Sequence, residues 1–149
     1  MSSETPLVCF ETTMVIAFLK GEADRVAACR AALHDGEAGT TRPLTSAFTL
    51  AEVVRHGQRR LNGQALAMID GFFNQPWIRV VALDRNVSTE ARRISWEYGL
   101  KPPDAVHIAT AVFYGAKALF TYDDQILELD GAVPNLSIGE PAGQLLLIT

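Results

Sequence analysis

Four acidic residues lie at positions where an unpaired carboxylate is costly: Glu11, Glu52, Asp104 and Asp123. Glu11 and Asp123 each come just after a short apolar run typical of a buried strand, Asp104 opens an apolar helix, and Glu52 lies inside another helix. No lysine or arginine is an obvious local partner for Glu11, Asp104 or Asp123. A divalent cation would supply the missing positive charge, because Mg²⁺ and Mn²⁺ prefer oxygen ligands such as these carboxylates. The pattern therefore predicts metal-assisted cleavage of a phosphodiester bond, in which the cation activates and orients a water molecule.

The prediction depends on the four acids meeting in space, because two of them also fit purely structural roles. Asp104 can stabilise the N-terminus of its helix, and Glu52 can pair with Arg55 three residues further on. The carboxyl ends of parallel strands are the usual ligand-binding edge of an α/β sheet, and Glu11 and Asp123 are expected there. No Ser-His-Asp or Cys-His arrangement and no glycine-rich phosphate loop offers a competing chemistry.

Composition indicates one globular domain over residues 1–149. Hydrophobic residues make up 48% of the chain and charged residues 20%. The net charge of −4 argues against a broad basic surface for nucleic acid, although a metal can still attract phosphate locally. Cys9 and Cys29 are expected to be buried thiols, and no spacing suggests zinc. The polar N-terminus and the lack of a membrane-length apolar run predict a cytoplasmic protein with no membrane contact. The apolar run 145–148 is expected to be a last strand or an interface tail.

Strand-like runs alternate with helical patterns along the chain. The predicted strands cover residues 7–10, 43–45, 78–83, 118–121 and 135–138. The predicted helices cover residues 14–19, 23–34, 47–60, 64–73, 85–98, 104–114 and 123–129. Thr12 or Thr13, Ser46 and Asp84 are the expected N-caps, with glycines as stops. This alternation predicts a mostly parallel sheet with helices on both faces.

Four stretches of sequence, each carrying one of the acids, together resemble a known family. They are VCFETT at 8–13, SAFTLAEVV at 46–54, KPPDAVHIATA at 101–111 and LFTYD at 119–123. The third is the most specific, because Pro-Asp-Ala-x-His-x-Ala-Thr-Ala is close to a family signature. In order and spacing, over roughly residues 6–140, the chain resembles a PIN domain of the VapC type, the toxin of bacterial toxin–antitoxin pairs.

The resemblance implies a fold and an activity. The expected fold is α/β, a PIN-like three-layer α/β/α sandwich with a mostly parallel central sheet of four or five strands. The expected activity is that of a Mg²⁺- or Mn²⁺-dependent endoribonuclease, which hydrolyses RNA with a metal-activated water and leaves a 5′-phosphate and a 3′-hydroxyl. The expected partners are the RNA substrate, a cognate antitoxin whose tail enters the active-site groove, and a second copy of the chain in a homodimer.

The resemblance also assigns residues by position. It makes Glu11, Glu52, Asp104 and Asp123 the catalytic and metal-binding acids. Thr12 or Thr13 matches the hydroxyl after the first acid, and Thr121 matches the one that helps place the fourth.

Several further residues fit either a functional or a structural role. His107, one turn after Asp104, can act as a base or ligand, but a supporting role beside the site is favoured. Arg55 and Arg59 are candidates for contacts with RNA phosphates or acidic antitoxin residues, or belong to a solvated face. Trp77 and Trp96 can stack on bases, although packing is favoured for Trp77 and a core or dimer contact for Trp96.

Glu11 departs from the family pattern, in which the first acid is normally aspartate. The extra methylene moves the carboxylate roughly one bond length, and Mg²⁺ demands near-ideal octahedral geometry. Glu11 fits an active natural variant, a weakened family member or an engineered change. It therefore raises a second hypothesis, a weakened or inactive PIN-like module that binds RNA or a protein. A receiver-like or phosphohydrolase domain ranks last, because the chain lacks a convincing Asp-x-Asp pair and a placed lysine.

Overall fold

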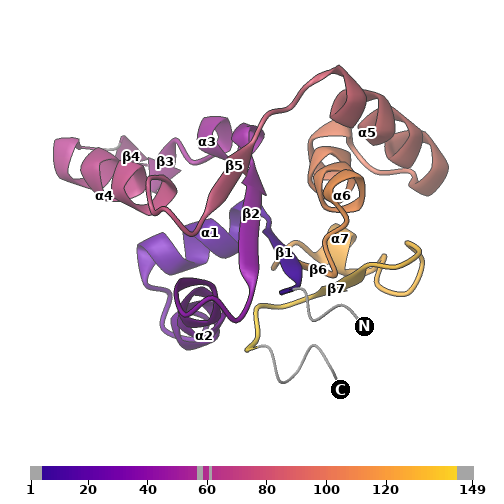
Figure 1. Ribbon diagram of the computed structural model, residues 1–149. Helices are drawn as coiled ribbons and strands as arrows, with labels where there is room; N and C mark the ends of the chain where they lie inside the picture. Colours follow the sequence, from indigo (N-terminus) through magenta and orange to yellow (C-terminus); the bar gives the residue numbers. More distant parts are fainter. Residues whose placement is uncertain (1–4, 57–58, 61, 144–149) are drawn as a thin grey trace.

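Five parallel strands form the centre of the fold, in the order β5–β2–β1–β6–β7 (Figure 1). The computed structural model describes residues 5–143 apart from 57, 58 and 61, and no side chain is described from 55 to 61. The strands are β1 (Leu7–Phe10), β2 (Arg42–Ser46), β5 (Arg79–Val81), β6 (Ala118–Phe120) and β7 (Ser137–Gly139). β1 lies between β2 and β6, and Cys9 pairs with Leu44 on one side and Leu119 on the other. All the pairs in this sheet are parallel, as predicted.

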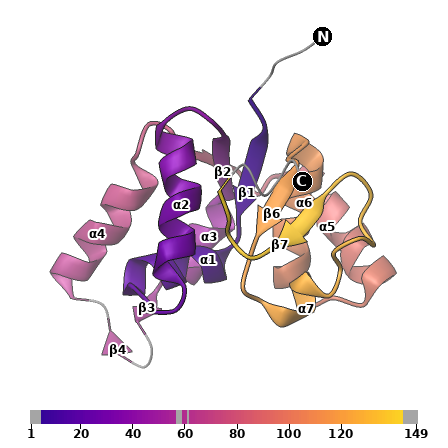
Figure 2. The same ribbon diagram turned by 90° about the horizontal axis from the view of Figure 1, so that it is seen from below.

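Helices cover both faces of this sheet and complete the predicted three-layer α/β/α sandwich. They are α1 (Thr12–Lys20), α2 (Val26–Glu37), α3 (Ala47–Glu52), α4 (Gly63–Phe73), α5 (Arg85–Tyr98), α6 (Pro102–Tyr114) and α7 (Asp124–Leu127). Figures 1 and 2 show α1, α2 and α4 on one side of the sheet and α5, α6 and α7 on the other. None of the helices that the structure describes is long and apolar enough to cross a bilayer.

The core has two halves because side chains alternate along each strand. Cys9 of β1 packs with the α5–α6 cluster, whereas its neighbours Val8 and Phe10 pack with the α1–α2 cluster. Cys9 and Cys29 are both free and buried, as predicted. Burial raises the pKa of both thiols, so neither is an activated nucleophile.

The predicted helix 47–60 is wrong beyond Glu52. Ser46 is its N-cap as expected, but α3 has only six residues. A two-stranded antiparallel hairpin follows, formed by β3 (Arg55–His56) and β4 (Arg59–Arg60). The apolar face that supported the longer helix is not buried: Leu50 is 44% exposed and Val54 is 56% exposed. Without burial, the helix lacks the tertiary packing that lengthens most protein helices.

Most other predicted elements begin and end within two residues of the observed bounds, but the predicted helix 23–34 is shifted, because α2 runs from Val26 to Glu37. Asp84 caps α5 and Gly99 ends it in a left-handed conformation. However, Glu11 rather than Thr12 or Thr13 is the N-cap of α1. A core or a dimer contact was expected for Trp96, and the core position is wrong, because Trp96 is 87% exposed; the dimer contact stays a prediction. The apolar run 145–148 lies outside the described residues.

Candidate active site

The four predicted acids lie on elements that surround the carboxyl edge of the sheet. Glu11 directly follows β1, and Asp123 comes three residues after the end of the neighbouring β6. Asp104 is in the first turn of α6, and Glu52 is the last residue of α3. Burial raises the pKa of Asp104, and the charges of Asp123 and Glu11 raise it further. The structure therefore brings Asp123 and Glu11 within electrostatic reach of Asp104.

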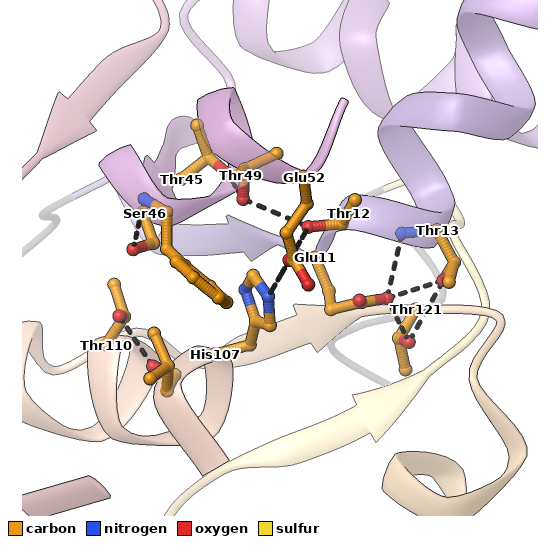
Figure 3. A network of polar contacts seen from close by, with 12 residues as sticks. Glu11, Thr12, Thr13, Thr45, Ser46, Thr49, Glu52, His107, Thr110 and Thr121 are labelled. Carbon is orange, nitrogen blue, oxygen red and sulfur yellow. Dashed lines mark hydrogen bonds and ion pairs between the residues drawn. The ribbon is translucent and has the colours of Figure 1, made fainter. Parts of the chain in front are cut away.

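Glu11 is held by a dense set of hydrogen bonds (Figure 3). Its Oε1 accepts from the backbone N–H of Thr13 at 3.0 Å, from Thr13 Oγ1 at 2.5 Å and from Thr121 Oγ1 at 2.6 Å. Its own backbone N–H donates to the carbonyl of Phe120 at 3.0 Å. Only 4% of Glu11 is exposed. One carboxylate oxygen thus caps α1 and ties it to the end of β6, which leaves Oε2 as the atom available to a ligand.

Glu52 is oriented by two side chains from other elements (Figure 3). Its Oε1 accepts from Thr12 Oγ1 at 2.6 Å and lies 2.8 Å from Nε2 of the buried His107. Burial alone would raise the pKa of Glu52, but the hydrogen bonds from His107 and Thr12 and the charge of His107 lower it below its ordinary value. The contact with a carboxylate assigns the ring hydrogen to Nε2. His107 therefore occupies the supporting position that the sequence favoured.

A second layer of hydroxyl groups lies beneath these contacts and was missed by sequence reasoning. Thr45 Oγ1 donates to the carbonyl of Phe10 at 2.7 Å, and the same hydroxyl oxygen lies 3.0 Å from Thr49 Oγ1. Thr49 Oγ1 is in turn 3.4 Å from Thr12 Oγ1. Thr45 and Thr49 are both fully buried. The only signal in the sequence was a hydroxyl at the end of an apolar strand followed by another one helical turn later.

Asp123 and Asp104 differ in how many of their oxygens are used. Asp123 Oδ1 accepts from the backbone N–H of Ile126 at 3.0 Å and caps α7. Thr121 Oγ1 accepts from the backbone N–H of Asp123 at 3.0 Å, which matches its expected placing role. Asp104 has no hydrogen bond among the contacts of the described residues. Its carboxylate is therefore the least engaged of the four.

A family model describing the PIN domain matches residues 8–132. The chain belongs to the PIN-domain family. No curated protein sequence shows a significant match to the chain.

Solved structures of other PIN proteins share this fold. A toxin–antitoxin complex from Klebsiella pneumoniae is 20% identical with a TM-score of 0.64, over 91% of this chain and 98% of that chain. DNA-bound VapBC from Salmonella typhimurium is 19% identical with a TM-score of 0.65, over 92% and 98%. VapC20 of Mycobacterium tuberculosis, a sarcin–ricin loop cleaving toxin, is 17% identical with a TM-score of 0.59, over 79% and 92%. At these identities the likeness shows the fold alone.

The candidate ligand atoms of this PIN domain are carboxylate oxygens, which are the kind of ligand that a hard divalent cation prefers. Asp104 offers both oxygens, and Glu11, Glu52 and Asp123 each offer one that makes no hydrogen bond among the described residues. Within the described ranges, no three acidic, histidine or cysteine side chains are grouped closely enough to hold one ion by themselves. Mg²⁺ usually binds through one or two carboxylates and keeps several waters, so it does not require such a group. Burial and the negative charges of Asp123 and Glu11 raise the pKa of Asp104, and a bound cation would offset both effects.

The side chains of Arg55 and Arg59 lie outside the described residues, although their backbones form the hairpin after α3. Their contact with RNA or antitoxin stays a prediction. Glu52, for which Arg55 was the alternative partner, pairs with His107.

The Asp104→Asn variant of this PIN domain is expected to melt about 1–3 °C higher than the parent protein at pH 7. The raised pKa means that folded Asp104 keeps its proton at a pH where the unfolded chain, near 3.8, has lost it. The free energy of unfolding therefore falls as the pH rises through this window, and asparagine avoids that loss. The favourable interaction of Asp104 with the N-terminus of α6 offsets part of the gain.

Thermal melts in EDTA from pH 4 to pH 7 test this prediction. The difference between variant and parent should grow with pH and should nearly vanish at the acid end. A variant that is less stable than the parent at pH 7 would show that the repulsion does not dominate at this position.

Proposed function

We propose that this PIN domain is a Mg²⁺- or Mn²⁺-dependent endoribonuclease of the VapC toxin type. The observation that carries the proposal is that Glu11, Asp104 and Asp123 lie at the carboxyl edge of the sheet, where burial and the charges of Asp123 and Glu11 raise the pKa of Asp104. Repelling carboxylates at the edge where α/β sheets bind ligands favour a cation and, with it, a phosphate group. The fold shared with VapC20, which is described as a sarcin–ricin loop cleaving toxin, supports the same assignment.

Each residue has a distinct task in the proposed reaction. Asp104 and one neighbouring acid would hold the cation directly, and the others among Glu11, Glu52 and Asp123 would reach it through its waters. When bound, the cation would lower the pKa of a water and neutralise charge on the phosphodiester. Thr12 and His107 keep Glu52 ionised, because their hydrogen bonds lower its pKa.

A cognate antitoxin is the proposed protein partner. The structural neighbours from Klebsiella and Salmonella are toxin–antitoxin assemblies. This chain has an open cleft of about 440 Å³ on the α1–α2–α4 side of the sheet. Phe18, Leu33, Phe72 and Trp77 give it apolar walls, and charged residues of α2 lie among them. Such a cleft suits a helix or extended segment with apolar anchors.

A homodimer is also proposed. Leu50 of α3 and Val54, two residues past its end, expose large apolar side chains on one segment. Burial of these side chains against a second copy would remove them from water.

A weakened or inactive PIN module is the second candidate, and the Glu11 contacts favour it. Glutamate replaces the aspartate usual in the family, and three donors already occupy its Oε1. Placement errors of about 1 Å can cost roughly 10²-fold in rate. This candidate binds RNA or a partner protein without cutting RNA.

Removal of divalent cations is expected to abolish RNA cleavage, and Mg²⁺ or Mn²⁺ is expected to restore it. The measurement is the cleavage of mixed cellular RNA in EDTA, followed by titration with each metal. Addition of Mn²⁺ should also raise the melting temperature of the protein in the absence of RNA, because a ligand of the folded state stabilises it.

Two outcomes contradict the first proposal. Equal cleavage in EDTA would rule out the metal mechanism. Binding of RNA without cleavage at any metal concentration would establish the second candidate in its place.

A further inference from the structure

A groove of about 470 Å³ lies between α5 and the N-terminal end of α6, outside the acidic site. Ala91, Pro102 and Val106 supply apolar surface, while Arg92, Ser95 and Trp96 line the α5 side. We propose that this groove stacks a base of the single-stranded RNA substrate, a few nucleotides from the phosphodiester held at the acidic site. The proposal rests on the proposed nuclease function and deepens it.

Trp96 is the first observation. It is 87% exposed, the most exposed of the large hydrophobic side chains in the described part of the chain. An indole ring exposed to water gains no stabilisation from burial, so packing within the domain does not explain a tryptophan at residue 96. Every base has a π-face that can stack on such a ring without regard to sequence.

The charge of the groove is the second observation. Arg92 lies one helical turn before Trp96 and makes no ion pair within the described part of the chain, and no acidic side chain lines the groove. The adjacent Arg93 is different, because it pairs with both Glu90 and Glu97 on α5. An unpaired guanidinium beside an indole suits a nucleotide, since the cation contacts phosphate while the ring stacks on the base.

The location of the groove is the third observation. Pro102 lines the groove, and Asp104 lies two residues later in the first turn of the same helix. Residues two apart face roughly opposite sides of a helix, whose diameter with side chains is about 10–12 Å. An RNA strand that passes around the N-terminal end of α6 would have to cover about this width, so the stacked base would be a few nucleotides from the phosphodiester at the acidic edge.

The surroundings of Trp96 favour RNA over a second copy of the chain as the occupant. The core of a protein interface is apolar and depleted of charge. The exposed neighbours of Trp96 on α5 include Arg92, Arg93 and Glu97. The exposed aliphatic residues Leu50 and Val54 lie on a different element.

RNA binding in EDTA tests the proposal, because no cleavage is needed to observe it. The probe is a fluorescent single-stranded RNA of about 10 nucleotides with mixed sequence, followed by anisotropy. Trp96→Ala is expected to raise Kd about 10-fold, whereas Trp96→Phe keeps most of the affinity. Arg92→Gln is expected to raise Kd a few-fold and to reduce the salt dependence of binding.

The chain supplies matched controls for both variants. Phe113→Ala removes another exposed aromatic ring, on α6, and Arg93→Gln removes the neighbouring arginine, which is already paired. Both should bind RNA with nearly the parental Kd. In a Trp77→Phe background, RNA should also quench the fluorescence of Trp96.

Specific results would overturn the subsite. One is an unchanged Kd for Trp96→Ala together with unquenched Trp96 fluorescence in the Trp77→Phe background. The other is a Trp96→Ala protein that loses its dimer in sedimentation but keeps its RNA affinity per protomer. The nuclease function fails separately: a protein that binds RNA through Trp96 but never cuts it supports the subsite and contradicts the enzyme. Cleavage by Trp96→Ala with unchanged KM contradicts the subsite alone.

Discussion

Replacing Asp104 by asparagine is expected to lower the rate of RNA cleavage by about 10³-fold in saturating Mg²⁺. Asp104 is the acid whose carboxylate makes no hydrogen bond among the described residues, so its charge has no structural partner to satisfy. Asparagine keeps the shape of the side chain and removes the charge that holds a cation. Single-turnover cleavage of a defined RNA gives the rate, and the Mn²⁺-induced rise in melting temperature reports metal binding separately.

Asp124→Asn is the matched control for this variant. Asp124 lies in the first turn of α7, next to Asp123, and is exposed. Its replacement makes the same change in net charge at the same edge of the sheet and should leave the rate close to that of the parent. Equal rates for Asp104→Asn and the parent would remove Asp104 from the proposed mechanism.

Replacing Glu11 by alanine is expected to lower the free energy of unfolding by about 3 kcal/mol, whether or not the protein is an active enzyme. The substitution removes the N-cap of α1 and leaves the Thr13 N–H, Thr13 Oγ1 and Thr121 Oγ1 without their acceptor. Because the site is buried, water cannot easily replace that acceptor. Urea denaturation, with the midpoint and slope compared to those of the parent, measures the loss.

Two conservative variants separate the structural role of Glu11 from a metal-binding role. Glu11→Gln keeps an oxygen acceptor and should lose less than about 1 kcal/mol, but it should weaken Mn²⁺ binding if Oε2 is a ligand. Glu11→Asp restores the residue usual in the family and should increase metal affinity or rate if the longer side chain is costly. A Glu11→Ala protein as stable as the parent would contradict the capping role.

Local signals account for the parts of the fold that the sequence predicted well. The apolar run 7–10 is β1, and Asp84 and Gly99 bound α5 as expected. Such signals depend on neighbours within one turn, so they can be read directly from the chain. Periodicity alone failed at 47–60, because a stripe containing Leu50 and Val54 does not say whether anything packs against it.

The positions of the four acids along the strands and helices could be predicted from the sequence, but their hydrogen-bond partners could not. The acids follow strands or open helices, and those positions are visible in the sequence. Their partners are not: His107 is 55 residues from Glu52 and Thr121 is 110 residues from Glu11. The same separation accounts for the error in the cap of α1, since nothing local indicates that a glutamate will be held by β6.

The parallel order β2–β1–β6 has a consequence during synthesis. β1 is made first, but its second neighbour in the sheet, β6, begins at Ala118. Ribosomes synthesise a chain from its N-terminus onward at about 5–20 residues per second. A ribosome-bound chain therefore carries Glu11 for several seconds before the segment that anchors it exists. If the proposed nuclease activity is present, it would therefore be absent from the nascent chain until nearly the whole domain has left the ribosome.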